Sequence, residues 1–216
     1  MRFTIGFAKQ VWAGLLVLLA LTVVLGVIYP AAVWGVSRIS PGSAEGSPVT
    51  DAAGCVVGSA WVGVDPQVAE GQQDPFFHNR VVGSVSDEDP FATGDPAAAL
   101  PSNQGPSSEI LAGFIIERRA AIAAREGVDP ASVPVDAVTG SGSGIDPHIS
   151  PAYAELQVAR VAANNGISED QVRGLVAEHT DGRQLGFLGA ERVNVLELNL
   201  ALGLTAPTCA APTTGG

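Results

Sequence analysis

An uncharged apolar run near the N-terminus limits what this 216-residue chain can fold into more than any other feature. From Val11 to Ala32 no residue is charged. As a helix at 1.5 Å per residue, this run would be roughly 33 Å long, about the thickness of the hydrocarbon core of a bilayer. Trp12 and Tyr29 lie near its ends and Trp34 lies just beyond, where amphipathic rings favour the headgroup region. The run therefore predicts one transmembrane helix with these three side chains at the membrane interfaces.

Two alternatives to a transmembrane helix are weaker. A cleaved signal peptide has an apolar core of about 7 to 15 residues followed by a cleavage site of small residues. This run is longer, and its best cleavage candidate, Gly42-Ser43-Ala44, lies well past its end. A helix buried in a soluble core would show a polar face, which this run lacks. We therefore expect an intact span at residues 11–32.

The charges around the run set its expected orientation. Arg2 and Lys9 precede it with no acidic residue beside them, whereas only Arg38 follows it closely. Because basic residues favour the cytoplasmic side, we expect residues 1–10 in the cytoplasm and the rest of the chain beyond the span outside it. Residues 39–216 hold all 22 acidic residues against eight arginines, a formal charge of −14. This charge excludes a basic groove for nucleic acid.

The sequence after the span divides into a linker, one domain and a tail. Residues 33–49 are expected to form the linker, because their second half is rich in Pro, Gly and Ser. Residues 50–204 are long enough for one globular domain of ordinary size. Residues 205–216, which end in APTCAAPTTGG, are typical of a disordered tail.

The first helix of the domain is predicted from its two ends. Ser107 and Ser108 can cap its start, and Gly127 can end it. An apolar stripe at helical spacing runs between them. Three arginines, Arg118, Arg119 and Arg125, are expected on the side opposite this stripe.

Two further helices and several strands complete the prediction. Ser150-Pro151 indicates a helix that closes near Gly166. Ser168 opens another helix with a capping box. Strand-like runs are Cys55 to Val64, which suggests one bent strand or a small pair, Leu185 to Leu188, and Val193 to Val195. We therefore expect an α+β fold, with a single N-terminal transmembrane helix followed by one mixed α/β extracytoplasmic domain.

Motifs for nucleotide hydrolysis and serine catalysis are incomplete. The glycine-rich loop from Thr139 to Ile145 could wrap an anion, but a Walker loop needs a lysine. The only lysine of the chain, Lys9, precedes the span. Neither Ser141 nor Ser143 stands in a Gly-x-Ser-x-Gly elbow. We interpret the loop as a tight, ordered turn.

The histidines give no stronger signal. Asp146, His148 and nearby serines make a poor catalytic triad, because three polar residues within a loop are common. His78, His148 and His179 are scattered and lack the spacing of a zinc site. We therefore expect no catalytic residue, no metal site and no enzyme activity of the chain by itself. A membrane-anchored extracytoplasmic enzyme or a sensor domain stays an alternative.

Two cysteines, Cys55 and Cys209, could pair outside the cytoplasm. Cys209 lies in the expected tail, where a structural bridge is uncommon. The sequence leaves the pairing open.

Two long strings carry a family resemblance. Residues 133–161 read VPVDAVTGSGSGIDPHISPAYAELQVARV, and residues 186–202 read GFLGAERVNVLELNLAL. Shorter matches are Val27 to Pro30, Gly58 to Gly63 and the stretch from Ser102-Asn103 to Ser107. With these strings the chain resembles the C subunit of the Kdp potassium-transporting ATPase, over nearly everything from Val11 to Gly203.

Two stretches depart from the pattern of that family. Phe76 to Val82 keeps the aromatic residues and Arg80 but lacks the family's glycine and proline. Leu100-Pro101 replaces a double glycine. The longest matching strings are untouched.

The resemblance implies an accessory subunit of a high-affinity, ATP-driven potassium uptake pump in the cell membrane. The implied partners are a channel-like, potassium-translocating A subunit, a P-type ATPase B subunit and a small F peptide, with membrane lipid around the span. A role in assembly is implied, and so is a catalytic-chaperone effect that raises the ATP affinity of the B subunit. No cofactor would be bound stably, and ATP would be met only in a transient complex with the B subunit. With about ten residues in the cytoplasm, an indirect effect through the span is the alternative to direct contact with ATP.

On this resemblance the span would pack against the A subunit, and the outer domain would dock over the potassium entrance. Small residues at Gly14, Ala20 and Gly26 would allow a close approach of helices. The acidic surface would raise the local potassium concentration only modestly, because salt screens charges within roughly 8 Å. The candidate docking residues are Arg80, Asn103, Asp146, His148, Asn194, Glu197 and Asn199.

Overall fold

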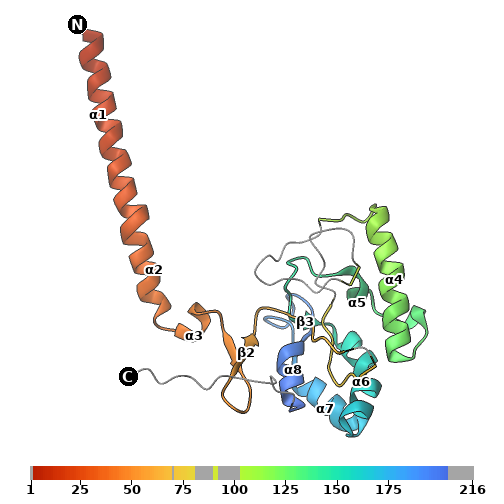
Figure 1. Cartoon of the computed structure of the whole chain (residues 1–216). Coiled ribbons are helices and arrows are strands. Elements are labelled where there is room, and N and C mark those ends of the chain that lie inside the picture. The colour runs from red at the N-terminus through yellow and green to blue at the C-terminus, as the bar shows by residue number, and fades with distance from the viewer. Residues whose placement is uncertain (1, 70, 81–89, 92–102, 204–216) are drawn as a thin grey trace. The chain divides into compact units, whose positions relative to one another are not determined.

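The computed structural model describes residues 2–69, 71–80, 90–91 and 103–203 (Figure 1). The chain forms two compact units, Met1–Ser47 and Pro48–Gly216. The predicted tail at residues 205–216 lies outside the described residues, as does Cys209. Cys55 is buried and disulfide-bonded.

The first unit is a long apolar helix. It consists of α1 (Arg2–Val23), the π-helical turn η1 (Val24–Ile28) and α2 (Tyr29–Ser37), with the short α3 (Pro41–Ala44) after them. The stretch Ile5–Ser37 is long and apolar enough to cross a membrane, and it is the one such helix among the described residues. The prediction of one N-terminal apolar helix is confirmed, and the helix extends beyond residues 11–32 at both ends. The predicted interface side chains, Trp12, Tyr29 and Trp34, are all exposed on it.

The second unit contains two small antiparallel sheets. The first pairs β1 (Pro48–Thr50) with β2 (Val56–Ser59). The second has the order β3-β5-β4, with β3 (His148–Ile149) and β4 (Thr180–Asp181) on either side of β5 (Arg192–Asn194). The predicted strand at Val193 to Val195 is thus confirmed one residue earlier, and the run from Cys55 supplies β2.

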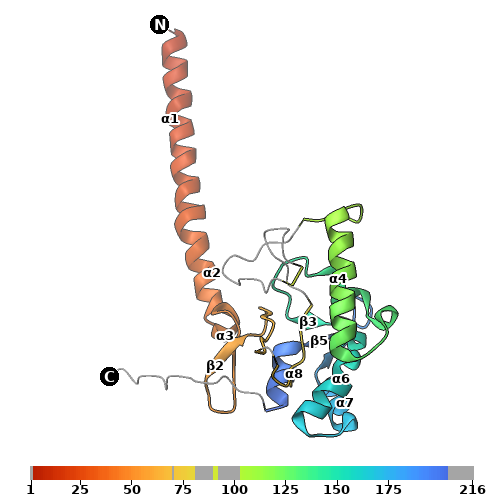
Figure 2. The same ribbon diagram turned by 45° about the vertical axis from the view of Figure 1, so that its right-hand side comes forward.

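Six helical segments occur among the described residues of the second unit. They are α4 (Glu109–Glu126), η2 (Pro130–Ser132), α5 (Val135–Thr139), α6 (Pro151–Asn165), α7 (Glu169–Glu178) and α8 (Val195–Ala201). Helix α6 packs against both α7 and α4, and α7 also contacts α8. Figures 1 and 2 show α6 and α7 side by side near the lower end of α4. The mixed α and β domain is the predicted class.

The core lies around α6. Its largest fully buried side chains include Tyr153 from α6, Phe77 from an irregular segment, Ile149 from β3 and Leu198 from α8. Removing this apolar area from water stabilises the fold, at about 25 cal/mol per Å². Since Phe77 belongs to this core, the segment that carries it is fixed in place.

The helix ends follow the predicted caps. The side chains of Ser108, Ser150 and Ser168 each accept a hydrogen bond from the backbone N–H three residues later. Gly127 and Gly166 end α4 and α6 in the left-handed conformation, which glycine adopts without a Cβ clash. All three helices are therefore confirmed.

One predicted feature of α4 is wrong. Arg118 is only 4% exposed rather than on a solvent side. Its guanidinium donates to the carbonyl oxygens of Pro90 at 2.6 Å and Val138 at 3.1 Å, and it lies over the ring of Phe114. A long side chain can be buried where carbonyl groups meet its charged end.

Candidate docking site

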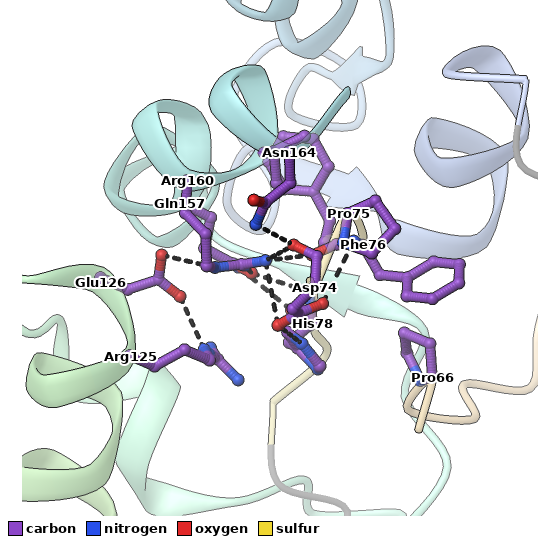
Figure 3. A network of polar contacts seen from close by, with 12 residues as sticks. Pro66, Asp74, Pro75, Phe76, His78, Arg125, Glu126, Gln157, Arg160 and Asn164 are labelled. Atoms are coloured by element: carbon purple, nitrogen blue, oxygen red, sulfur yellow. Dashed lines mark hydrogen bonds and ion pairs between the residues drawn. The ribbon is translucent and has the colours of Figure 1, made fainter. Parts of the chain in front are cut away.

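An extended segment from Asp74 to Arg80 crosses the domain without pairing as a strand, and residues 77–79 of it are buried. Side chains replace the missing strand partner (Figure 3). Gln157 accepts from the His78 N–H at 2.7 Å and donates to the His78 carbonyl at 3.2 Å. Asn199 does the same for Phe77, at 2.7 and 2.9 Å. Because buried backbone groups without partners are costly, these two amides hold the segment in place.

His78 lies between two carboxylates. Its Nδ1 is 2.9 Å from Oδ2 of Asp65, and its Nε2 is 2.8 Å from Oδ2 of Asp74. An ionised carboxylate only accepts hydrogen bonds, so each carboxylate favours a proton on the ring nitrogen that faces it. Burial acts to lower the pKa of His78, but the two carboxylates raise it above its ordinary value. Burial acts to raise the pKa of Asp74, but His78 and Arg160 hold it below its ordinary value.

Arg160 connects this segment to α4. Its NH1 donates to the carbonyl oxygens of Asp74 at 2.8 Å and Phe76 at 2.9 Å, and its Nε donates to Glu126 at 2.9 Å. The Glu126 carboxylate is fully buried, and its other oxygen accepts from Arg125 at 2.7 Å. We call Asp65, Asp74, His78, Glu126, Gln157 and Arg160 the His78 network. Its groups face each other, so its role is to hold the fold.

Arg80, at the end of the same segment, reaches a second group of charges. Its NH2 donates to Oδ2 of Asp146, while Oδ1 of Asp146 accepts from the His148 N–H at 3.0 Å and lies 2.9 Å from His148 Nδ1. The ring of Trp61 meets that of His148 edge-on, with centroids 6.4 Å apart. Burial acts to raise the pKa of Asp146, but His148 and Arg80 hold it below its ordinary value. Three predicted docking residues, Arg80, Asp146 and His148, thus form one group, the Arg80 cluster.

The Arg80 cluster lines a cleft of about 330 Å³, together with Asp136, Glu191 and Arg192. Two further carboxylates, those of Asp136 and Glu191, also line the cleft. Asp136 accepts hydrogen bonds from the Ser150 N–H and hydroxyl, both at 2.9 Å. Glu191 directly precedes Arg192, another lining residue, in the chain. The cleft therefore presents both signs of charge over a small area. Such a surface suits ion pairs with another protein better than an apolar small molecule.

The glycine-rich loop before Asp146 is the predicted tight turn. The Ser141 hydroxyl oxygen accepts from the backbone N–H groups of Ser143 at 3.2 Å, Gly144 at 3.1 Å and Asp146 at 3.2 Å. Gly63 packs against the end of this loop, and a Cβ there would come within 2.5 Å of the Asp146 carbonyl oxygen. The loop and this glycine together fix Asp146.

The other predicted docking residues are not brought to the Arg80 cluster. Asn194 donates to the Ala60 carbonyl at 2.9 Å and caps α8 by accepting from the Glu197 N–H at 3.2 Å. The Asn199 side chain is hydrogen-bonded to the backbone of Phe77. Glu197 and Asn103 are exposed, and Asn103 has a φ of 57°.

An exposed apolar turn was missed by the sequence reasoning, which predicted a strand at Leu185 to Leu188. Gln184 and Leu188 exchange two backbone hydrogen bonds of 2.9 Å and close a tight turn, which we call the apolar hairpin. Leu185 is 82% exposed and Phe187 68% exposed. Leu185 also has a φ of 53°, which is rare for an apolar side chain and marks a candidate functional position. Gly186, between two apolar residues, was the turn signal in the sequence.

No group of three or more His, Cys, Asp or Glu side chains that could hold a metal ion occurs within the part of the chain that the structure describes. What the described surface offers is ion pairing at the Arg80 cluster and apolar contact at the hairpin. The fold is that of a mixed α and β domain attached to a candidate membrane helix.

Comparison with known proteins narrows this class. The family model "K+-transporting ATPase, c chain" matches residues 11–203. A relative from Kineococcus radiotolerans, a potassium-transporting ATPase KdpC subunit, is 50% identical over 202 residues, which cover 92% of this chain and 95% of the relative. Relatives of the same name come from Streptomyces avermitilis, 42% identical over 208 residues (90% and 93% covered), and Mycobacterium tuberculosis, 43% identical over 199 residues (90% and 97% covered).

The chain belongs to the KdpC family, the c chain of the K+-transporting ATPase. It is therefore an accessory subunit of a potassium uptake pump, and its long apolar helix is the candidate for its membrane span.

Proposed function

We propose that this chain is a non-catalytic subunit that assembles and stabilises the potassium pump by docking its second unit on the channel-like A subunit. Residues 1–10 lie in the cytoplasm, the apolar helix crosses the membrane, and the domain from Pro48 onward lies outside the cytoplasm. This orientation rests on Arg2 and Lys9 before the span and on the acidic composition after it.

The exposed apolar hairpin is the observation that carries the docking role. Ala190 and Glu191, which line the cleft, follow the hairpin directly in the chain. Apolar anchors next to a polar rim are the arrangement that stable protein interfaces use. The hairpin is closed by its own hydrogen bonds, so little conformational entropy is lost when it docks.

The B subunit and the small F peptide complete the proposed complex. In this proposal the chain holds no cofactor, and it raises the ATP affinity of the B subunit indirectly, through its span and the A subunit. The support is the expected orientation, which puts the folded unit from Pro48 onward on the side of the membrane opposite to cytoplasmic ATP. Contact with ATP in a transient complex is the competing form of the same role.

Affinity purification of this chain from gently solubilised membranes tests the proposal. We expect channel-like and P-type subunits in the eluate, with potassium-stimulated ATPase activity that is lost when this chain is omitted. Full activity of a complex that lacks the chain would contradict the role in assembly. Catalytic turnover by the isolated chain would instead support the alternative of a membrane-anchored extracytoplasmic enzyme.

The Arg80 cluster can be tested within the same assay. Asp146→Ala combined with His148→Ala should lower the recovery of the partner subunits, because it removes the ion pair to Arg80 and the edge-on contact with Trp61. His179→Ala is the matched control, since that ring lies 2.9 Å from the Leu175 carbonyl at the end of α7 and is not part of the Arg80 cluster. Unchanged recovery in the double variant would exclude the cluster as a docking surface.

A further inference from the structure

The π-helical turn η1 leaves the Leu25 carbonyl of the apolar helix without its usual donors. In an α-helix the carbonyl of Leu25 accepts from the N–H of Tyr29, four residues later. Here the Tyr29 N–H donates to Val24 instead. The residue five positions after Leu25 is Pro30, which has no N–H. Neither an α-helical nor a π-helical hydrogen bond from these positions therefore reaches the Leu25 carbonyl.

Leu25 lies within the uncharged stretch of the apolar helix. The uncharged stretch between Lys9 and Arg38 has its middle at Val23 and Val24. At 1.5 Å per residue, Leu25 is about 6 Å below Tyr29 and about 20 Å above Trp12. Both measures put its carbonyl in the hydrocarbon region, where lipid offers no hydrogen-bond donor and an unsatisfied backbone group is costly.

The neighbouring residues make this carbonyl accessible to another helix. Gly26 follows it directly, and a Cβ at Gly26 would meet nothing within 4 Å. By contrast, the one hydroxyl near the middle of the span is already used, because Thr22 donates to the Leu18 carbonyl at 2.8 Å. The Thr22 hydroxyl is therefore not available to the Leu25 carbonyl.

We infer that the Leu25 carbonyl accepts a hydrogen bond from a hydroxyl, amide or indole side chain on a transmembrane helix of another pump subunit. The chain is a subunit of a membrane-bound pump, so helices of other subunits are the donors within reach of its span. π-helical turns recur at functional sites, and small residues beside them allow helices to approach closely. The inference rests on the proposed assembly role and adds the chemistry of the contact within the membrane.

Isotope labelling of the full chain detects this hydrogen bond directly. Carbonyl-13C leucine combined with 15N glycine marks only Leu-Gly pairs, and Leu25-Gly26 is the one such pair within the span. Solid-state NMR should show the Leu25 carbonyl resonance moving downfield when the chain in bilayers is joined by its partner subunits. A resonance already downfield in the isolated chain would assign the donor to water or lipid headgroups and overturn the inference. A resonance that is not shifted in either sample would overturn it as well.

Replacement of the proline gives an independent readout. Pro30→Ala restores an N–H that can serve the helix's own carbonyls, so the partner helix loses its acceptor. We expect about a threefold lower recovery of partner subunits, the usual worth of one hydrogen bond between membrane helices. Pro41→Ala, outside the span, and Thr22→Val, which removes an internal bond, are the controls and should leave recovery unchanged.

The two levels of the argument fail differently. If the wild-type chain recovers no partner subunits, the assembly role itself is wrong. If the wild type and Pro30→Ala recover partners equally well, the assembly role stands and the Leu25 contact is wrong.

Discussion

The His78 network and the apolar hairpin use their side chains in opposite ways. Around His78, charged and amide groups point inward and satisfy a buried stretch of backbone (Figure 3). In the hairpin, apolar side chains point outward although Leu185 must adopt a left-handed backbone conformation to do so. Polar groups that satisfy each other hold a fold, whereas exposed apolar groups on a rigid turn are useful only to a partner. Mutations in the first region should therefore affect stability, and mutations in the second should affect assembly.

The largest expected effect on stability comes from Gln157. Gln157→Leu leaves the buried N–H and carbonyl of His78 without partners, so we expect the free energy of unfolding to fall by about 2 to 4 kcal/mol. Chemical denaturation of the full chain in detergent measures this. Gln73→Leu, at an exposed position of the same irregular region, is the control and should change stability little. A loss equal to that of the control would show that the segment is held without the amide.

The hairpin should respond in the opposite way. Leu185→Asp with Phe187→Asp removes two exposed apolar anchors, so we expect about a tenfold lower recovery of partner subunits. The thermal stability of the isolated chain should stay unchanged. Ile116→Asp is the matched control, because Ile116 is 69% exposed on α4, away from the hairpin in the sequence. Equal effects of both variants would mean that any exposed apolar residue matters and that the hairpin is not a specific contact.

Local signals predicted the parts of this fold that depend on few residues. Serine caps and terminal glycines fixed the ends of α4, α6 and α7, because a cap acts within one helical turn. The pairing of Asn199 with Phe77 joins positions 122 residues apart, and no local pattern announces it. Asn199 was predicted as a docking residue, whereas the structure shows its amide bonded to backbone in the interior.

The candidate site was predictable to a similar extent. The matched strings pointed to Asp146 and His148, which the tight turn at Ser141 places together. The hairpin was misread because Leu185 to Leu188 looks like a strand when only residue type is considered. Glycine conformations and hydrogen-bond closure, rather than side-chain preference, decide that segment.

The pH dependence of stability distinguishes the His78 network from the rest of the domain. The pKa of His78 is raised in the fold, so its contribution is fully present below the ordinary histidine value, about 6.5, and is lost as pH rises through the folded value. The pKa of Asp74 is lowered, so its contribution is present above about 3.9 and is lost as pH falls through its folded value. We expect a thermal midpoint that declines as the pH is raised above neutrality. His78→Gln should flatten this decline, and a slope identical to that of the wild type would locate the effect elsewhere.

The smallest expected effect separates stability from docking at one residue. Leu185→Asn keeps a residue that tolerates a positive φ and relieves the strain of the leucine, so stability should rise by a few tenths of a kcal/mol, about the scale of such backbone effects. Partner recovery should fall all the same, because the exposed apolar side chain is lost. Val135→Asn is the control, at an exposed position with ordinary helical geometry at the start of α5. It should not raise stability while lowering partner recovery. If Leu185→Asn were less stable than the wild type, the leucine would be supporting the hairpin itself, and its exposure would no longer argue for a partner.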